Sequence, residues 1–123
     1  MRIYLAGPMT GLPFHNREAF THAANALRAT GYAVVSPLEV YDAVHTATRG
    51  AGLRNVIAEE LRELCFCDGV ALLDGWEQSK GVRYEIQIAA YLGLQIQTLA
   101  GWLDGENFAK NQEAIPNSQR GAA

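Results

Sequence analysis

The chain is short of cysteine and of positive charge, and each shortage excludes a class of protein. Only two cysteines, Cys65 and Cys67, occur among its 123 residues. Their spacing matches neither a zinc knuckle nor a redox Cys-x-x-Cys pair, which favours two small buried side chains in a reducing compartment. The formal net charge is −3 and no basic stripe is present, so polymeric nucleic acid is not an expected partner.

Signals for membranes, secretion and metals are also missing. No apolar run approaches the roughly 20 residues that a membrane span requires, so no membrane contact is expected. The apolar segment after Met1 is too short for a signal peptide, which makes the cytoplasm the expected location. His15, His22 and His45 are scattered without metal-ligand spacing, so we expect them at the surface and predict no metal site.

What the chain does have is apolar residues, 49% of the total, which is enough for one compact domain with its own core. Short, nearly continuous apolar runs predict strands over 3–6, 32–36, 70–73 and 94–99. Apolar residues at helical spacing predict helices over 17–29, 53–66 and 79–92. This alternation is typical of a small doubly wound α/β fold, Rossmann-like or flavodoxin-like, with a parallel sheet of roughly four to five strands and helices on both faces.

Single residues suggest where some of these elements begin and end. Asn16 is suited to cap the helix over 17–29, and Gly31 is suited to end it. The segment that follows the second strand is ambiguous, and we expect a short helix over 38–44 and then a loop over 46–52.

The last part of the chain differs in composition from the rest. Residues 1–100 form the predicted domain, and residues 101–123 form a tail that is expected to be partly docked and partly disordered. The aromatic residues Trp102 and Phe108 can dock on the body or on a partner subunit, whereas residues 117–123 are small and polar and are expected to fray.

The first predicted strand runs into a glycine-containing loop, 7–13, that can bind an anion. Gly7 and Gly11 can adopt positive φ and expose backbone N–H groups, Met9 lies between them, and Thr10 adds a hydroxyl donor. No Gly-Lys-Ser/Thr follows, and the middle glycine of a dinucleotide fingerprint is missing. A plain strand-to-helix turn therefore remains an equal alternative.

A second candidate follows the third predicted strand, where a helix opens with Ser79 and Gly81 and carries Glu85. Ser79 can cap this helix, whose N-terminus attracts anions. Glu85 lies about 9 Å further along the axis, at roughly 1.5 Å per residue, which is close to the separation between a nucleotide's phosphate and its anomeric carbon. A carboxylate among apolar neighbours is often catalytic, although an ordinary amphipathic helix with an exposed Glu is the simpler alternative. Trp76, in the preceding turn, can stack on a base or pack in a core or interface.

Three segments, 3–11, 67–73 and 79–86, occur in an order and spacing that resemble a known superfamily. Together they resemble the nucleoside 2-deoxyribosyltransferases, most closely the phage and bacterial branch of the DUF4406 type. The Ser-x-Gly-Val-x-Tyr-Glu segment that begins at Ser79 is also similar to the 2′-deoxynucleoside 5′-phosphate N-hydrolases. The likeness covers roughly residues 2–99.

The resemblance implies a role for individual residues. Glu85 falls on the nucleophilic glutamate, which attacks the anomeric carbon of a 2-deoxyribose and releases the base. Tyr4 falls on a tyrosine that helps to hold this glutamate. Glu60 falls where the family has an aspartate that contacts the sugar and assists proton transfer. The phosphate-binding positions fall on Ser79, Gly81, Gly7 and the backbone of the loop that contains Met9, Thr10 and Gly11.

The chain departs from the pattern of these relatives at several positions. Glu60 is one methylene longer than the family's aspartate, and Asp68 is an alternative acid that can equally be structural. Pro8 stands where the nucleotide hydrolases have a phosphate-binding serine, and Thr10 stands where they have an arginine. Two phosphate contacts are therefore missing or replaced. Cations that can compensate are Lys80 and Arg83.

The leading expectation is an enzyme that cleaves or transfers the N-glycosidic bond of a (deoxy)nucleoside or its 5′-monophosphate without a metal or organic cofactor. The match at Ser79 and Gly81 favours a hydrolase. A second hypothesis is a non-catalytic nucleotide-binding or regulatory module of the same fold, and a third is a structural dimerisation domain anchored by Trp76, Trp102 and Phe108. A homodimer or larger homo-oligomer is expected under all three.

Overall fold

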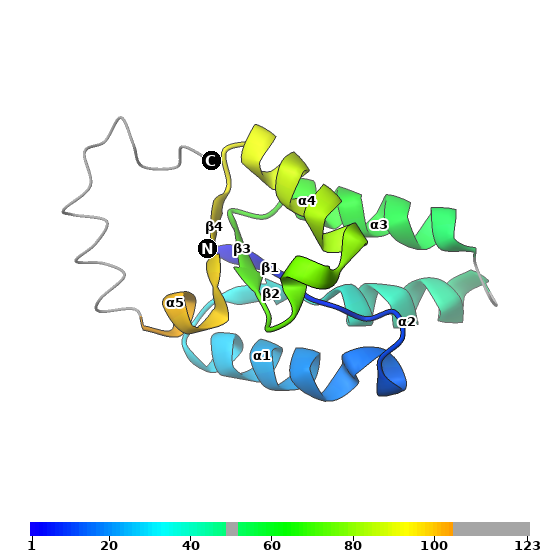
Figure 1. Cartoon of the computed structure of the whole chain (residues 1–123), viewed down its shortest axis with the longest axis horizontal. Coiled ribbons are helices and arrows are strands. Elements are labelled where there is room, and N and C mark those ends of the chain that lie inside the picture. Colours follow the sequence, from blue (N-terminus) through cyan, green and yellow to red (C-terminus); the bar gives the residue numbers. More distant parts are fainter. Residues whose placement is uncertain (49–51, 105–123) are drawn as a thin grey trace.

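The structure, a computed structural model, describes residues 1–48 and 52–104. Its centre is a four-stranded sheet with the order β2-β1-β3-β4, in which every neighbouring pair is parallel (Figure 1). The strands are β1 (Arg2–Ala6), β2 (Ala33–Val35), β3 (Gly69–Leu72) and β4 (Gln95–Thr98). The predicted doubly wound α/β fold is therefore confirmed.

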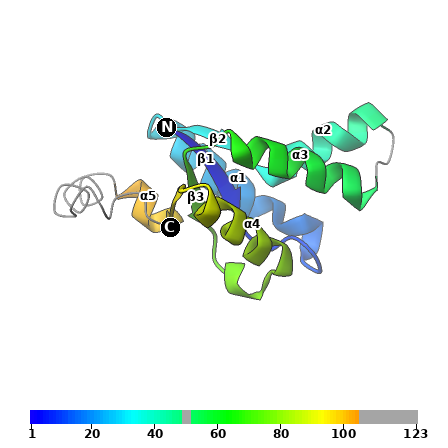
Figure 2. The ribbon, with the colours of Figure 1, turned by 90° about the horizontal axis from the view of Figure 1, so that it is seen from above.

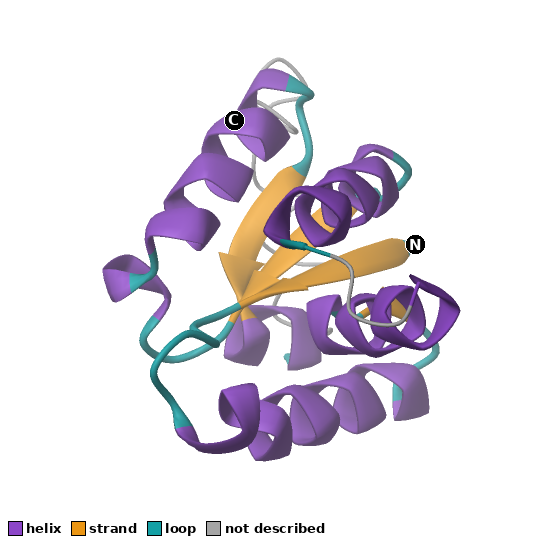
Figure 3. Cartoon of the chain, turned by 90° about the vertical axis from the view of Figure 1, so that its right-hand side faces the viewer, coloured by secondary structure: helices purple, strands orange, loops and turns teal. Residues whose placement is uncertain are grey.

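Helices cover both faces of this sheet, as Figures 2 and 3 show from two directions. They are α1 (Arg17–Ala29), α2 (Pro37–Thr48), α3 (Leu53–Cys65), α4 (Lys80–Tyr91) and α5 (Leu99–Leu103). Two short turns of 3-10 type, η1 (Pro13–Asn16) and η2 (Trp76–Gln78), precede α1 and α4.

Alternation along β1 divides the core into two clusters, because successive side chains of a strand point to opposite faces. Ile3 and Leu5 pack with buried residues of α1 and α5, whereas Tyr4 packs with buried residues of α3 and α4. We call the first face the α1/α5 face and the second the α3/α4 face. The order of the strands places a switch point between β1 and β3, and ligands of such folds bind at the carboxyl ends of the strands there.

Two predicted boundaries differ from the structure. Asn16 precedes α1, but its side chain does not cap the helix; its Nδ2 donates instead to the carbonyl of Pro8 at 3.0 Å. The predicted loop over 46–52 is wrong at its start, because α2 continues to Thr48. This helix packs against α3, and such tertiary contacts extend helices beyond what their propensity predicts.

The end of the described chain belongs to the core. Trp102, in α5, is fully buried, and its indole Nε1 donates to the carbonyl of Val70 at 2.8 Å. A Cβ on Gly69 would lie 2.5 Å from the Trp102 ring, so the indole fits closely over the start of β3. Of the two positions expected for Trp102, on the body or on a partner subunit, the structure shows the first, whereas Phe108 and residues 117–123 lie outside the described residues.

The predicted burial of both cysteines holds for Cys67 only. Cys65 is exposed on α3. Leu64 and Cys67 are buried in the cluster of the α3/α4 face, and helical geometry turns Cys65 away from it. Among the residues that the structure describes, no helix has the length and apolar character needed to cross a bilayer.

Candidate functional site

A cavity of about 1050 Å³ opens at the carboxyl ends of the strands, beside the switch point. Its walls come from the loop after β1, the start of α4, and the facing sides of α2 and α3. Seven of the predicted site residues line it: Gly7, Met9, Thr10, Glu60, Ser79, Gly81 and Glu85. Residues that lie 78 positions apart in the chain are thereby brought into one cavity.

The start of α4 is built as the sequence predicts. Ser79 caps the helix, because its Oγ accepts a hydrogen bond from the backbone N–H of Val82 at 3.3 Å. A Cβ added to Gly81 would meet no atom within 4 Å, so this glycine borders open space in the cavity wall. The first N–H groups of a helix have no partners within it and carry partial positive charge, so this end of the cavity suits an anion.

Glu85 lies about one and a half turns further along α4, where its side chain reaches Tyr4 of β1. The phenol of Tyr4, which is fully buried in that strand, donates a hydrogen bond to Glu85 Oε2. Burial, and next the negative charge of Glu85, raises the pKa of Tyr4 well above its usual value. Tyr4 therefore stays protonated and acts as a fixed donor that orients the carboxylate.

Two carboxyl groups of this cavity titrate near neutrality. Burial raises the pKa of Glu85 to about 7, against the hydrogen bond from Tyr4, which favours the ionised form. Burial, and next the charge of Glu85, raises the pKa of Glu60 to about 7. Because the Tyr4 hydrogen bond stabilises an ionised Glu85, and that charge keeps the proton on Glu60, the pair near pH 7 favours one carboxylate and one carboxylic acid.

Three predicted functional residues lie elsewhere. Gly11 is not among the lining residues, although its φ of +82° confirms that this position needs glycine. Trp76 does not line the cavity and packs, partly buried, against the core of the α3/α4 face. Asp68 precedes β3, at the end of the sheet opposite the cavity, and its Oδ2 accepts a hydrogen bond from the N–H of Arg2 at 2.8 Å. Asp68 therefore lies away from Glu85 and Glu60, which favours its structural alternative over a role as the acid.

The cavity also contains aromatic side chains that the sequence reasoning missed. His15, Tyr41 and His45 line its wall. The two histidines were expected at the surface. His15 is indeed exposed but borders the cavity, and His45 is half-buried. Tyr41 and His45 are four residues apart on α2, a spacing that places them on the same side of a helix. That signal was available, whereas nothing local in the sequence placed His15 beside them.

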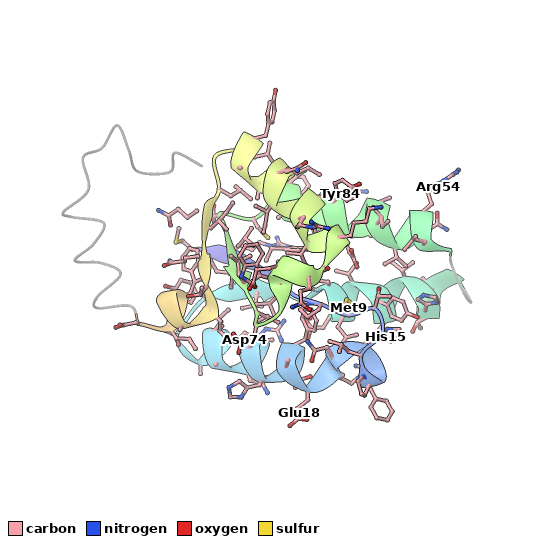
Figure 4. The ribbon with its side chains drawn as sticks, viewed as in Figure 1. Met9, His15, Glu18, Arg54, Asp74 and Tyr84 are labelled. Atoms are coloured by element: carbon pink, nitrogen blue, oxygen red, sulfur yellow. The ribbon has the colours of Figure 1, made fainter. Side chains whose placement is uncertain are left out.

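A second hollow, of about 700 Å³, lies on the other side of the loop after β1. The two spaces share Pro8, Thr10 and Gln78 in their walls, and His22 and Asp74 line only the second one. Figure 4 labels Met9 and His15 on the side of the first cavity and Asp74 on the side of the second. Within residues 1–48 and 52–104, no group of three or more His, Cys, Asp or Glu side chains is arranged to hold a metal ion.

Comparison with known proteins places the chain in a family. A search of curated proteins finds no match. A family model matches residues 1–98. This range contains every strand of the sheet and every residue of the cavity wall named above. The chain therefore belongs to the family described as Domain of unknown function (DUF4406).

Proposed function

We propose that the protein cleaves the N-glycosidic bond of a (deoxy)nucleoside or its 5′-monophosphate, with Glu85 as the nucleophile and water as the favoured acceptor. The observation that carries this proposal is the hydrogen bond from Tyr4 to Glu85 in a cavity that also contains Glu60 and the open start of α4. This reaction needs a fixed carboxylate and a second carboxyl group that can hold a proton, and an anion site suits a substrate that carries a 5′-phosphate.

The chemistry can be written for the residues that are present. A Glu85 oxygen attacks C1′ of the sugar, the bond from C1′ to the base nitrogen breaks with its electron pair, and Glu60 gives its proton to the departing base. Water then attacks C1′ of the glycosyl ester, Glu60 takes a proton from that water, and the bond from C1′ to Glu85 breaks. Both carboxyl groups return to their starting protonation states. A pKa of about 7 suits Glu60 to both steps.

The start of α4 supports a phosphorylated substrate. Its unpaired N–H groups, the hydroxyl of Ser79 and the open space beside Gly81 form a seat for a 5′-phosphate. Lys80 lines the same part of the cavity and supplies a cation. This arrangement compensates for Pro8 and Thr10, which stand where the hydrolases have a serine and an arginine.

The test is base release from a panel of deoxynucleosides, ribonucleosides and their 5′-monophosphates, followed by chromatography. We expect free base with the wild type, and a loss of about 10³-fold or more with Glu85→Gln, because the nucleophile has no substitute. The matched control is Glu77→Gln, which changes an exposed glutamate outside the cavity. Nucleotide binding without any base release, unchanged by Glu85→Gln, would instead identify a non-catalytic nucleotide-binding module.

A further inference from the structure

We infer that His15, Tyr41 and His45, here called the ring cluster, bind the planar heteroaromatic base of the substrate and determine which base is accepted. The inference deepens the proposed function and rests on it for the substrate class. It assigns a role to three side chains that the chemistry at Glu85 leaves unused.

The first observation is the arrangement of the rings. The centroids of His15 and Tyr41 are 5.2 Å apart at an interplanar angle of 45°, and those of Tyr41 and His45 are 4.1 Å apart at 44°. All three side chains line the cavity. Contiguous aromatic rings in a cavity wall stack on planar bases, and imidazole nitrogens can also donate or accept hydrogen bonds with a base edge.

The second observation is the backbone that places His15. Phe14, His15 and Asn16 have φ angles of +52°, +56° and +63°, a left-handed conformation that is unfavourable for residues with a Cβ. Such a conformation persists only where the surroundings hold it, and it concentrates at functional sites.

Two contacts hold this left-handed turn in place. Asn16 Nδ2 donates to the Pro8 carbonyl at 3.0 Å, which joins the turn to the loop after β1. Arg17, the next residue, donates two hydrogen bonds to the carboxylate of Asp42, at 3.0 and 3.1 Å. Asp42 is the neighbour of Tyr41 on α2, so this exposed ion pair links the start of α1 to the helix that carries the other two rings.

The third observation is the order of the helices around the cavity. Helix α3 packs against both α2 and α4, and it lies between them in Figure 1. Tyr41 and His45 on α2, Glu60 on α3 and Glu85 on α4 therefore follow one another across the cavity, with His15 beside Tyr41. A base bound at the ring cluster, with its sugar at Glu85, has Glu60 beside the bond between them, where a proton donor to the departing base must lie.

The first experiment needs no variant, because the chain has only three histidines. Adenine and, separately, thymine are titrated into the wild type while the imidazole proton signals are followed by NMR. We expect at least one of the two bases to shift the signals of His15 and His45 and to leave His22 unchanged, since His22 lines the other hollow. If neither base moves His15 or His45, or if His22 responds equally, the inference is overturned.

The second experiment separates the base from the rest of the substrate, with dAMP and 2-deoxyribose 5-phosphate as probes. In a Glu85→Gln background, which prevents turnover, Tyr41→Leu should weaken binding of dAMP by about 10-fold and leave binding of the sugar phosphate unchanged. Tyr41→Phe, which keeps the ring, and His22→Ala, which removes an imidazole outside the cavity, are the controls and should bind both probes like the parent.

The outcomes distinguish this inference from the proposed function. Equal weakening of both probes by Tyr41→Leu, or full base release by a Tyr41→Leu and His45→Leu double variant, overturns the ring cluster and leaves catalysis at Glu85 intact. Absence of base release from every substrate, together with base-induced shifts of His15 and His45, overturns the proposed reaction and supports the ring cluster as a base site.

Discussion

The two faces of the sheet are built from the same strands but bury different kinds of side chain. On the α1/α5 face, the strands present aliphatic side chains to α1 and to the buried indole of Trp102, whose one polar atom is bonded to a backbone carbonyl. On the α3/α4 face, the same strand β1 presents the phenol of Tyr4, which reaches a carboxylate. Both faces bury apolar side chains that stabilise the fold, and the α3/α4 face in addition contains carboxyl groups whose burial opposes stability.

The largest expected effect concerns the α1/α5 face. Trp102→Ala removes a fully buried indole and should lower the free energy of unfolding by about 3–5 kcal/mol, measured by chemical denaturation. The activity of the molecules that remain folded should change little, because Trp102 lies on the opposite side of the sheet from Glu85. A specific activity that falls as steeply as stability would show that the two faces are not separate.

On the α3/α4 face, Glu85→Gln should raise stability at high pH and abolish activity, whereas Trp102→Ala lowers stability and preserves activity. The pKa of Glu85 is about 7 in the folded protein and about 4.5 in the unfolded chain, so unfolding between these values releases a proton and stability falls as pH rises. The loss is complete above about pH 7 and amounts to roughly 3 kcal/mol. Glu85→Gln should therefore be more stable than the wild type at about pH 8 and nearly equal to it at about pH 4. Denaturation curves across this pH range test the prediction, and an unchanged difference in stability would refute it.

Tyr4→Phe sharpens the comparison within the α3/α4 face. It removes the hydrogen bond that favours the ionised form of Glu85, so the pKa of Glu85 should rise further. The acidic limb of the profile of kcat/KM against pH should therefore move to higher pH. A charged hydrogen bond of about 1.5–3 kcal/mol corresponds to a loss of about 10- to 100-fold in kcat/KM near pH 7. The control is Tyr91→Phe, an exposed tyrosine of the same helix that does not line the cavity, which should keep the wild-type profile.

The smallest expected effect on stability is that of Gly81→Ala. An added Cβ meets nothing within 4 Å, and alanine favours a helix. The free energy of unfolding should therefore stay the same or rise by up to about 1 kcal/mol. The methyl group would occupy the proposed phosphate seat, so KM should rise for a 5′-monophosphate and stay constant for the unphosphorylated nucleoside. An equal rise for both substrates would place the phosphate elsewhere. Gly69→Ala is the contrasting substitution, since its Cβ would collide with Trp102.

The sequence predicted those features that depend on neighbouring residues. The cap at Ser79 and the place of Glu85 on α4 follow from spacing within one helix, and the parallel sheet follows from the alternation of apolar runs. The roles of Tyr4 and Glu60 came only from the resemblance, because no local pattern shows that residues on β1 and α3 meet α4. Helix α5 was missed since it is five residues long and depends on the burial of Trp102. His15 was missed since a left-handed turn places it.

The proposed reaction requires Glu85 to become covalently attached to the sugar. The most direct measurement is mass spectrometry of the protein quenched in acid during turnover of the best substrate from the panel, followed by proteolysis. The peptide that contains Glu85 should carry the mass of the glycosyl group, and the same peptide of Glu85→Gln should carry none. Base release by a protein whose adduct is on another residue, or that forms no adduct under any quench condition, would contradict it.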